Sequence, residues 1–344
     1  MRAAVFTFLL VAVAHCPAFA GACTGAGTQL ASVNAKLTLN DVLGAETVLA
    51  PIRASHPDCP GILLAEGRIA AAKGNAQAAA DFYVQYTDLE PQDARGFAYF
   101  GRLFLDQRDY AKADALSAAA VDRNAGDPAS LALRGQILAM KGQSSEGKKL
   151  LEKACQLDPN DPEAQYQLGK IYDKEKNSIV AVKHFRKATS LNPADARAWD
   201  YLGLNLEPLE QLDAAEQAYG KALAANQRGR YYDAFVDYNY GRFLAKRNQL
   251  SAAKQHLDRA VVLAPQIRAV WYERSKLNLR MKNYEQARTD AETAAATEDP
   301  EQIIIDLQIY SLLGQVYARL GKTDLAKKYA ELTRDTPPPV HKEN

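Results

Sequence analysis

Residues 162–195 read PEAQYQLGKIYDKEKNSIVAVKHFRKATSLNPAD, and residues 196–229 repeat their pattern as ARAWDYLGLNLEPLEQLDAAEQAYGKALAANQRG. In the second stretch, four small or apolar residues at positions i, i+3, i+4 and i+7 share one face of a helix: Trp199, Leu202, Gly203 and Leu206. After a polar break, a second stripe follows at helical spacing: Ala215, Tyr219 and Ala222. Each stretch therefore predicts two amphipathic helices of about a dozen residues, joined by a tight turn.

The period of these stretches extends far along the chain. Glycines recur every 34 residues, at Gly67, Gly101, Gly135, Gly169 and Gly203. Twelve positions after each glycine stands an alanine or a glycine, and twelve positions further on a proline often follows. This repetition predicts an array over residues 26–334 with nine repeats, which begin near residues 26, 60, 94, 128, 162, 196, 234, 268 and 307.

Stacking of the repeats follows from the size of their helices. Helices of about a dozen residues are marginal alone in water, so their apolar stripes must be covered by neighbouring repeats. Small residues where two helices cross allow the backbones to approach closely. We expect three aromatic side chains to fill the space between layers: Tyr83, Phe185 and Tyr219. The pairs Asp158-Pro159 and Asn192-Pro193 are expected to end the second helix of their repeats.

Two insertions and a tail depart from the period. Residues 226–232 and 299–301 lie between repeats, and we expect each insertion to add about one helical turn to the repeat that follows. Residues 335–344 contain three consecutive prolines, so they are predicted to form a disordered tail. No long polar capping helix closes the array, and an exposed final face would favour docking or self-association.

Composition and charge restrict the function. The 344 residues are 47% hydrophobic and 24% charged, so the chain can bury a core and is not globally disordered. Its 42 lysines and arginines balance 41 aspartates and glutamates, which leaves no net field to attract nucleic acid or an anionic membrane surface. The repeats leave no block large enough for a separate catalytic domain.

Residues 1–20 have the pattern of a secretory signal peptide. Arg2 precedes an apolar run over residues 3–14 that is too short to span a bilayer. Residues 18–20, with the sequence AFA, predict cleavage after Ala20, which would place the mature protein in the periplasm or outside the cell. Two alternatives remain open: a buried N-terminal helix, and a lipoprotein acylated at Cys23, although the leucine usual three positions before such a cysteine is missing.

The repeated pattern resembles the tetratricopeptide repeat family. The resemblance covers nearly all of the mature chain and rests on these residues and their equivalents in other repeats: Leu168, Gly169, Tyr172, Ala181, Phe185, Ala188, Pro193, Trp199, Leu202, Gly203, Ala215, Tyr219 and Ala222. It implies a right-handed α-solenoid of helix pairs whose first helices line a concave groove. Members of the family usually bind partner proteins or extended peptides there and have no catalytic activity, so a scaffold or adaptor is expected. The alternative is a lipid-anchored assembly factor of the cell envelope, acylated at Cys23.

In this family, columns two, five, six and nine of each first helix usually face the groove. Carried over to this sequence, column nine supplies five candidate partner-binding cations: Arg68, Arg102, Lys170, Arg242 and Lys276. Columns five and six supply six more candidates: Tyr99, Tyr166, Tyr201, Tyr238, Asn239 and Tyr272. Residues three or four apart are neighbours on a helix. Four pairs are therefore expected to lie close together: Tyr99 with Arg102, Tyr166 with Lys170, Tyr238 with Arg242, and Tyr272 with Lys276.

This ladder of cations and phenols predicts that the groove binds an extended segment that is acidic or carries a carboxylate. The alternative is that the cations are merely solvated or form local ion pairs, such as Arg102 with Asp106. The two-repeat carboxylate clamp of chaperone-binding relatives is not matched, so a C-terminal chaperone tail is not the expected ligand.

The sequence contains no recognisable catalytic or metal-binding constellation. The mature chain has four histidines: His56, His184, His256 and His341. His184 and His256 occupy the same column of their repeats, with no second histidine or cysteine nearby in helical register, whereas a zinc site needs about four converging ligands. The chain also lacks the H-E-x-x-H and C-x-x-C motifs and a glycine-rich phosphate loop. We therefore expect surface histidines, no enzymatic activity, no metal, no cofactor and no small-molecule substrate.

The cysteines favour structural roles. Cys155 occupies a column held elsewhere by Val121 and Val261, which predicts a small core residue. Cys23 precedes the first helix of the first repeat and Cys59 follows its second helix, so the up-and-down path of the chain brings both to the same edge. In an oxidising compartment we expect a Cys23–Cys59 disulfide, while a free or lipidated Cys23 remains open.

Overall fold

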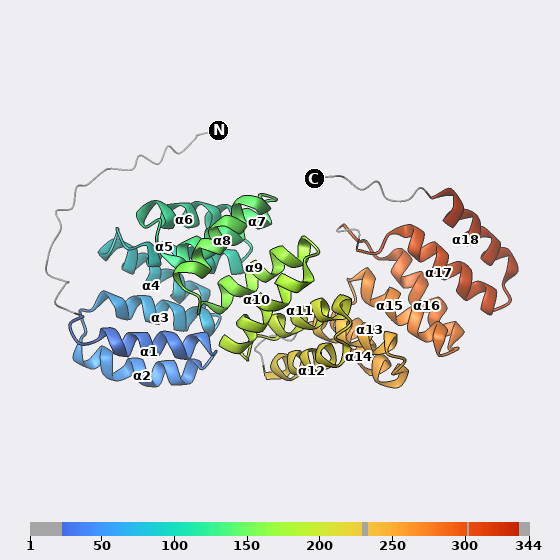
Figure 1. The fold of residues 1–344 in the computed structure, drawn as a ribbon, viewed down its shortest axis with the longest axis horizontal. Helices are drawn as coiled ribbons and strands as arrows, with labels where there is room; N and C mark the ends of the chain where they lie inside the picture. Colours follow the sequence, from blue (N-terminus) through green and yellow to red (C-terminus); the bar gives the residue numbers. More distant parts are fainter. Residues whose placement is uncertain (1–22, 229–232, 301–302, 337–344) are drawn as a thin grey trace. The chain divides into compact units, whose positions relative to one another are not determined.

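The structure is a computed structural model, and it describes residues 23–228, 233–300 and 303–336. These residues form eighteen α-helices and one short 3-10 helix, with no β-strand among them (Figure 1). The all-α class predicted from the sequence period is therefore confirmed. The chain divides into two compact parts, an N-terminal half, Met1–Ile171, and a C-terminal half, Tyr172–Asn344.

The helices follow one another in pairs. The N-terminal half contains α1 (Gly27–Thr38), α2 (Val42–Ser55), α3 (Pro60–Ala72), α4 (Ala76–Leu89), α5 (Ala94–Asp106), α6 (Tyr110–Arg123), α7 (Pro128–Met140), α8 (Ser144–Leu157) and most of α9 (Pro162–Lys174). The C-terminal half contains α10 (Ser178–Leu191), α11 (Ala196–Leu206), the 3-10 helix η2 (Glu207–Leu209), α12 (Leu212–Arg228), α13 (Ala234–Lys246), α14 (Leu250–Leu263), α15 (Arg268–Arg280), α16 (Tyr284–Ala296), α17 (Asp306–Arg319) and α18 (Thr323–Asp335). The odd-numbered helices open the nine repeats, and each begins within one residue of the start expected from the period.

Many helices begin after an aspartate or asparagine that caps the N-terminus. Asp127 precedes α7, and its Oδ2 accepts a hydrogen bond from the Ser130 amide at 2.8 Å. Asn75 precedes α4, and its Oδ1 accepts from the Ala78 amide at 3.3 Å. Such a cap satisfies a backbone donor that the helix leaves unpaired, and it stabilises the helix by about 1 kcal/mol. The sequence therefore sets the helix starts locally.

The turn inside each repeat depends on one residue in the left-handed backbone conformation. Nine such residues occupy column fifteen of the nine repeats: Asn40, Gly74, Arg108, Gly142, Lys176, Glu210, Asn248, Lys282 and Gly321. Glycine and asparagine adopt this conformation readily, whereas other residues pay about 1 kcal/mol for it. At the far end of the repeat, α8 stops before Asp158-Pro159 and α10 stops before Asn192-Pro193, as predicted.

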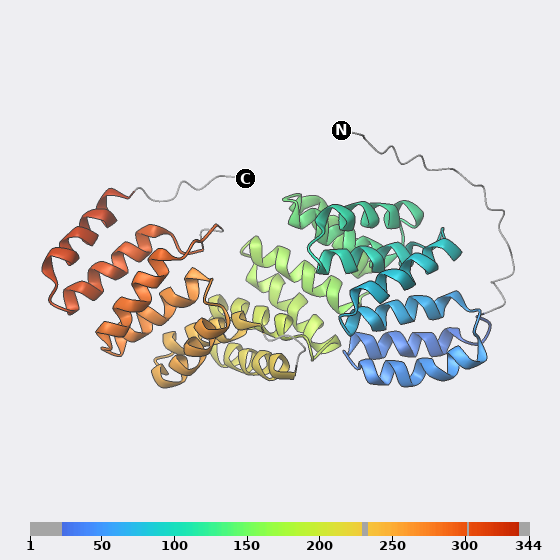
Figure 2. The same ribbon diagram turned by 180° about the vertical axis from the view of Figure 1, so that it is seen from behind.

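Packing within each half follows the order of the chain. From α1 to α8 and from α11 to α18, the two helices of a repeat contact each other, the second helix contacts the first helix of the next repeat, and neighbouring first helices also touch (Figure 1, Figure 2). The three aromatic side chains expected between layers are buried, since Tyr83, Phe185 and Tyr219 are at most 2% exposed. Burying a large aromatic or aliphatic side chain contributes about 2 kcal/mol.

Close approach of the backbones is most pronounced where α7 crosses α8. A methyl group added at Gly147 would lie 2.5 Å from the Gly135 carbonyl oxygen and 2.9 Å from the Ala139 amide nitrogen. A methyl group added at Gly135 would in turn lie 2.8 Å from the Gly147 carbonyl oxygen. Glycine is required at both positions because the opposing atoms belong to the backbone and cannot rotate away.

Replacing Gly147 by alanine is expected to destabilise the N-terminal half by about 2 kcal/mol, because the added methyl group would force α7 and α8 apart. The matched variant Gly220→Ala has the opposite expected sign. No atom lies within 4 Å of a methyl group added at Gly220, so alanine there should stabilise α12 by up to about 1 kcal/mol. Urea unfolding of both variants measures the difference, and a loss of similar size in both would contradict the tight crossing.

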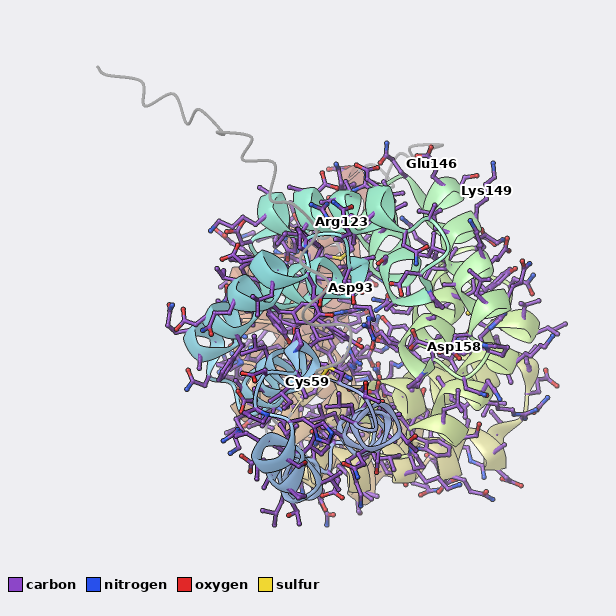
Figure 3. All side chains as sticks on the ribbon, turned by 90° about the vertical axis from the view of Figure 1, so that its left-hand side faces the viewer. Cys59, Asp93, Arg123, Glu146, Lys149 and Asp158 are labelled. Atoms are coloured by element: carbon purple, nitrogen blue, oxygen red, sulfur yellow. A yellow bond between two sulfur atoms is a disulfide. The ribbon has the colours of Figure 1, made fainter. Side chains whose placement is uncertain are left out.

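A disulfide joins the start of the first repeat to the turn that precedes the second repeat. Cys23 and Cys59 are bonded, with their Cα atoms 4.9 Å apart, so the pairing expected from the sequence is present in the structure. Cys59 caps α3 and is 2% exposed. His56 joins the same two ends, because its Nε2 donates to the Thr24 carbonyl at 3.1 Å. Figure 3 labels Cys59 together with Asp93, and each lies at a turn between successive repeats.

Three local expectations differ from the structure. In the described part of the insertion at 226–232, residues 226–228 extend α12, which spans 17 residues against 14 in α10, while α13 of the next repeat has 13 residues. The insertion at 299–301 adds no helical turn in its described part, since the chain is non-helical from Thr297 to Pro300 and α17 starts at Asp306. Cys155 is half-buried and not a core residue, and burial raises the pKa of its thiol to about 12.

The predicted signal peptide and most of the predicted tail lie outside the described residues. The signal peptide covers residues 1–20, and residues 337–344 of the tail are likewise not described. Within the described ranges, none of the helices is both long and apolar enough to cross a membrane.

Candidate partner-binding site

Two candidate cations of the N-terminal half, Arg68 and Arg102, bridge first helices of different repeats. Arg68 on α3 donates a hydrogen bond to Asn34 Oδ1 on α1, and its guanidinium carbon lies 4.5 Å from the centre of the Tyr99 ring on α5. The expected partner of Tyr99 was Arg102, whereas the cation that covers this ring is Arg68 from the preceding repeat. The cation–π contact therefore runs between repeats and not along one helix.

The Arg102 side chain contacts polar groups of two other first helices. Its Nη1 donates to Gln136 Oε1 on α7 at 2.6 Å and lies 3.4 Å from Glu163 Oε1 on α9. An ion pair thus joins Arg102 to Glu163 on a more distant first helix, whereas the alternative considered from the sequence was a local pair with Asp106. Through these contacts, Arg102 connects three first helices. Its side chain is only 29% exposed, which leaves little free surface for a ligand.

Tyr166 and Lys170 form one of the expected neighbouring pairs. The Lys170 ammonium lies 5.6 Å from the centre of the Tyr166 ring. Tyr166 is only 4% exposed, however, so the expectation that its ring faces an open groove is wrong. A ring buried to this degree contributes to packing.

In the C-terminal half, Arg242 belongs to a cluster of side chains around the carboxylate of Glu207. Its Nη2 donates to Glu207 Oε1 at 2.8 Å, and the same carboxylate accepts hydrogen bonds from Lys246 and from the Tyr219 hydroxyl at 2.7 and 2.6 Å. Arg242 is 24% exposed and Glu207 is 10% exposed. Burial also raises the pKa of the nearby Tyr238 to about 12, which keeps this phenol neutral. The cluster joins α13 to the end of α11.

Asn239 likewise serves the contact between α11 and α13. Its Nδ2 donates to Asp200 Oδ2 at 2.7 Å, and the two residues are 8% and 5% exposed. The expectation that Asn239 faces a ligand is therefore wrong. Tyr201 is half-buried and stacks on Phe185, with 5.4 Å between ring centres.

Where α11 and α13 are in contact, some buried polar atoms have no hydrogen-bond partner. In the described part of the chain, Asp200 Oδ1, Asn205 Oδ1 and Arg242 Nε make no hydrogen bond. Burial raises the pKa of Asp200 to about 8, although the hydrogen bond from Asn239 acts in the opposite direction. A carboxyl group that stays protonated at neutral pH avoids the cost of a buried charge.

The last two candidates, Tyr272 and Lys276, line a pocket. The Lys276 ammonium lies 5.1 Å from the centre of the Tyr272 ring, as expected for neighbours on α15, and 2.9 Å from Glu273 Oε1. The pocket has a volume of about 680 Å³ and lies between α15 and α17, with one residue from α18. Its lining comprises Tyr272, Lys276, Leu279, Arg280, Leu307, Gln308, Ser311, Leu312, Gln315 and Thr333.

The structure thus separates the eleven candidates into groups. Tyr272 and Lys276 line the pocket, and Tyr166 and Asn239 are buried. All five cations, including Lys276, have hydrogen bonds or ring contacts with other protein groups. Sequence reasoning missed Gln308, Ser311, Leu312 and Gln315, although these are columns two, five, six and nine of the last repeat. The same column rule would have found them. Glu207 lies in η2 outside these columns, so no sequence signal marked it.

The histidines are structural where the structure describes them. His256 Nδ1 lies 2.6 Å from Asp237 Oδ1, and the His256 side chain is 13% exposed, so the expectation of a surface histidine is wrong there. His184 stacks on Tyr172 with 5.5 Å between ring centres. His341 lies outside the described residues. No three histidine, cysteine, aspartate or glutamate side chains converge on a possible metal position within the described ranges.

Comparison with family models finds repeats along most of the array. Models described as tetratricopeptide repeat match residues 30–94, 238–303, 162–195 and 307–332, and a model described as TPR repeat matches residues 135–175. Together these matches cover more than half of the chain. A sequence comparison with curated proteins found no match.

Solved structures share the fold at low identity. The APC/C hetero-tetramer Cut9–Hcn1 matches with a TM-score of 0.70 and 15% identity over 90% of this chain, which spans 56% of that chain. PilF of Pseudomonas aeruginosa matches with a TM-score of 0.52 and 20% identity, over 62% of this chain and 93% of that one. PilW, a type IV pilus biogenesis factor, matches with a TM-score of 0.50 and 22% identity, over 58% and 90%. At these identities the likeness concerns the fold alone.

Proposed function

This chain belongs to the tetratricopeptide repeat family, and we propose that it is a non-enzymatic scaffold that binds a partner protein through an extended peptide. The observation that carries the proposal is the pocket between α15 and α17, because six of its ten lining residues lie in the columns that face the groove in this family: Tyr272, Lys276, Gln308, Ser311, Leu312 and Gln315. Stacked helices offer long open surfaces, and a pocket on such a surface suits a side chain of an extended segment.

We further propose that the protein works outside the cytoplasm. The Cys23–Cys59 disulfide supports this location, because such bonds persist in oxidising compartments. The signal-peptide pattern of residues 1–20 supports it independently. The disulfide also disfavours the lipid-anchored alternative, since the Cys23 sulfur cannot be acylated while it is bonded to Cys59.

Mass spectrometry of the exported, non-reduced protein tests this location and the state of Cys23. We expect a mature chain that starts at Gly21 and carries one intramolecular disulfide. A chain that keeps residues 1–20 after expression in the native host would contradict export, and a mass increase of a diacylglyceryl group at Cys23 would support the anchored form instead.

Photocrosslinking tests the binding surface. A photoreactive phenylalanine analogue at Gln315, which is exposed in the pocket lining, should crosslink a discrete partner peptide that can be sequenced by mass spectrometry. The control position is Glu146, an exposed residue of α8 (Figure 3). Equal crosslinking at both positions would refute a binding site in the pocket. Charge reversal of Arg102 or Arg242 is a poorer test, because both side chains bridge helices.

A further inference from the structure

We infer that the pocket between α15 and α17 binds an extended partner segment in which an aliphatic side chain stands beside an acidic one. This inference rests on the proposed function and adds the chemistry of the ligand. It is argued from the pocket's size, its apolar part and its charges.

The size and apolar part of the pocket suit an aliphatic side chain. A volume of about 680 Å³ falls within the range of specific ligand pockets, about 300 to 1,000 Å³. Leu279, Leu307 and Leu312 contribute apolar lining from both first helices. Leu312 is 4% exposed and belongs to the buried core of the last repeats, so this part of the lining is fixed by packing.

The polar lining suits a peptide main chain. Gln308, Ser311 and Gln315 are spaced three or four residues apart along α17, so their side chains follow one stripe of the helix. Amide and hydroxyl groups both donate and accept hydrogen bonds, as the N–H and C=O groups of an extended backbone require. Such a stripe can bind a main chain whatever its side chains are, so the charges must supply the selectivity.

The charges of the pocket have one sign. Lys276 and Arg280 line it, and none of the ten lining residues is an aspartate or glutamate. Arg280 donates to the Ala245 carbonyl at 2.6 Å and to Asn248 Oδ1 at 3.1 Å, and both acceptors are neutral. An incoming carboxylate would therefore meet two cations and no repelling group within the lining.

Lys276 is the candidate cation that a ligand can reach most easily. Its side chain is 45% exposed, against 29% for Arg102 and 24% for Arg242. Its pairing with Glu273, whose side chain is 12% exposed, lies within α15 and joins residues three positions apart on that helix. A ligand carboxylate can share this ammonium without breaking a contact between helices, which is not true of Arg102 or Arg242.

Fluorescence anisotropy with labelled peptides tests the inference on the full, non-reduced mature protein. The probes are three decapeptides in which leucine alternates with glutamate, glutamine or lysine. We expect the glutamate peptide to bind at least about tenfold more tightly than the glutamine peptide at low salt, with the advantage shrinking as salt rises. The lysine peptide should bind most weakly of the three.

Two variants assign the binding to the pocket. Lys276→Glu should weaken the glutamate peptide at least about tenfold and leave the glutamine peptide nearly unchanged, while the matched variant Lys149→Glu, on the exposed surface of α8, should change neither (Figure 3). Ser311→Trp places a large side chain in the pocket and should weaken both peptides. Circular dichroism and melting curves of each variant show whether it is folded.

Equal affinity for the glutamate and glutamine peptides would overturn the inference, as would unchanged binding in folded Ser311→Trp or Lys276→Glu. A crosslinked partner peptide at Gln315 that contains no acidic residue would also overturn it, yet the proposed function would stand. Absence of any specific crosslink at Gln315 would instead refute the proposed binding site itself. The two failures are therefore distinguishable.

Discussion

Replacing both Cys23 and Cys59 by serine is expected to cost the first repeat about 4 kcal/mol of stability. The disulfide closes a loop between residues 36 positions apart, and the lost chain entropy of the unfolded loop gives this magnitude. The first repeat depends on the bond more than other repeats would, because α1 buries only Val33. Without the bond, α1 and α2 should unfold before the rest of the array.

Hydrogen exchange resolved along the sequence measures this effect. In the double variant, amides of residues 27–55 should lose most of their protection, while those of α7 and α8 keep theirs. The control is Cys155→Ala, which changes the half-buried free cysteine and should leave exchange in α1 and α2 unaltered. Equal protection of residues 27–55 with and without the disulfide would show that packing alone holds the first repeat.

Replacing Asp200 by asparagine is expected to stabilise the C-terminal half at neutral pH. In the folded chain the pKa of Asp200 is raised to about 8, chiefly by burial, from an ordinary value of 3.8. Below about pH 4, Asp200 is protonated in both the folded and the unfolded chain, so its titration takes nothing from the free energy of unfolding. Between about pH 4 and 8, the unfolded chain releases the proton while the folded chain retains it, so stability falls as pH rises.

Asparagine removes this dependence because it does not titrate, and its carbonyl can still accept the hydrogen bond from Asn239. At pH 7 the gain should be on the order of 3 kcal/mol, and it should disappear near pH 4. Urea unfolding of wild type and variant at pH 4, 5.5 and 7 measures the difference. Parallel curves at all three pH values would show that Asp200 is ionised in the folded protein.

Asp290→Asn is the matched control, with the opposite expected sign. Asp290 is fully buried like its counterpart, but its two carboxylate oxygens accept hydrogen bonds from Arg274 at 2.6 and 2.9 Å. Removing the charge leaves a guanidinium that is only 14% exposed without its main partner, which should cost about 3 kcal/mol or more. A buried aspartate is thus favourable or unfavourable according to whether a cation faces it.

The architecture could be predicted because its causes are local and repeated. The period of 34 residues, the glycines at helix crossings and the prolines after second helices each act within one repeat, and they located the nine helix pairs. The insertions were misplaced because sequence does not say which neighbouring helix absorbs extra residues. The described part of one insertion, residues 226–228, extends α12, and the described part of the other is non-helical.

The candidate site was predictable only in outline. The columns that the family resemblance assigns to the groove include Tyr272 and Lys276, which line a pocket, and the same columns contain pocket residues of α17. The ion-pair partners of the candidate cations were not predictable, because Arg102 pairs with Glu163 and Arg242 pairs with Glu207, each in a different repeat. Such contacts depend on the distance between first helices, which the period of the sequence does not encode.

The left-handed residue at column fifteen has a consequence for how such an array can change. Its conformation is the same in all nine repeats, yet the residue there is glycine, asparagine, arginine, lysine or glutamate. Exchanging this residue alters how firmly a hairpin closes, but it alters none of the residues in the groove-facing columns. The stability of a hairpin and the residues that face the groove can therefore change independently of each other, one repeat at a time.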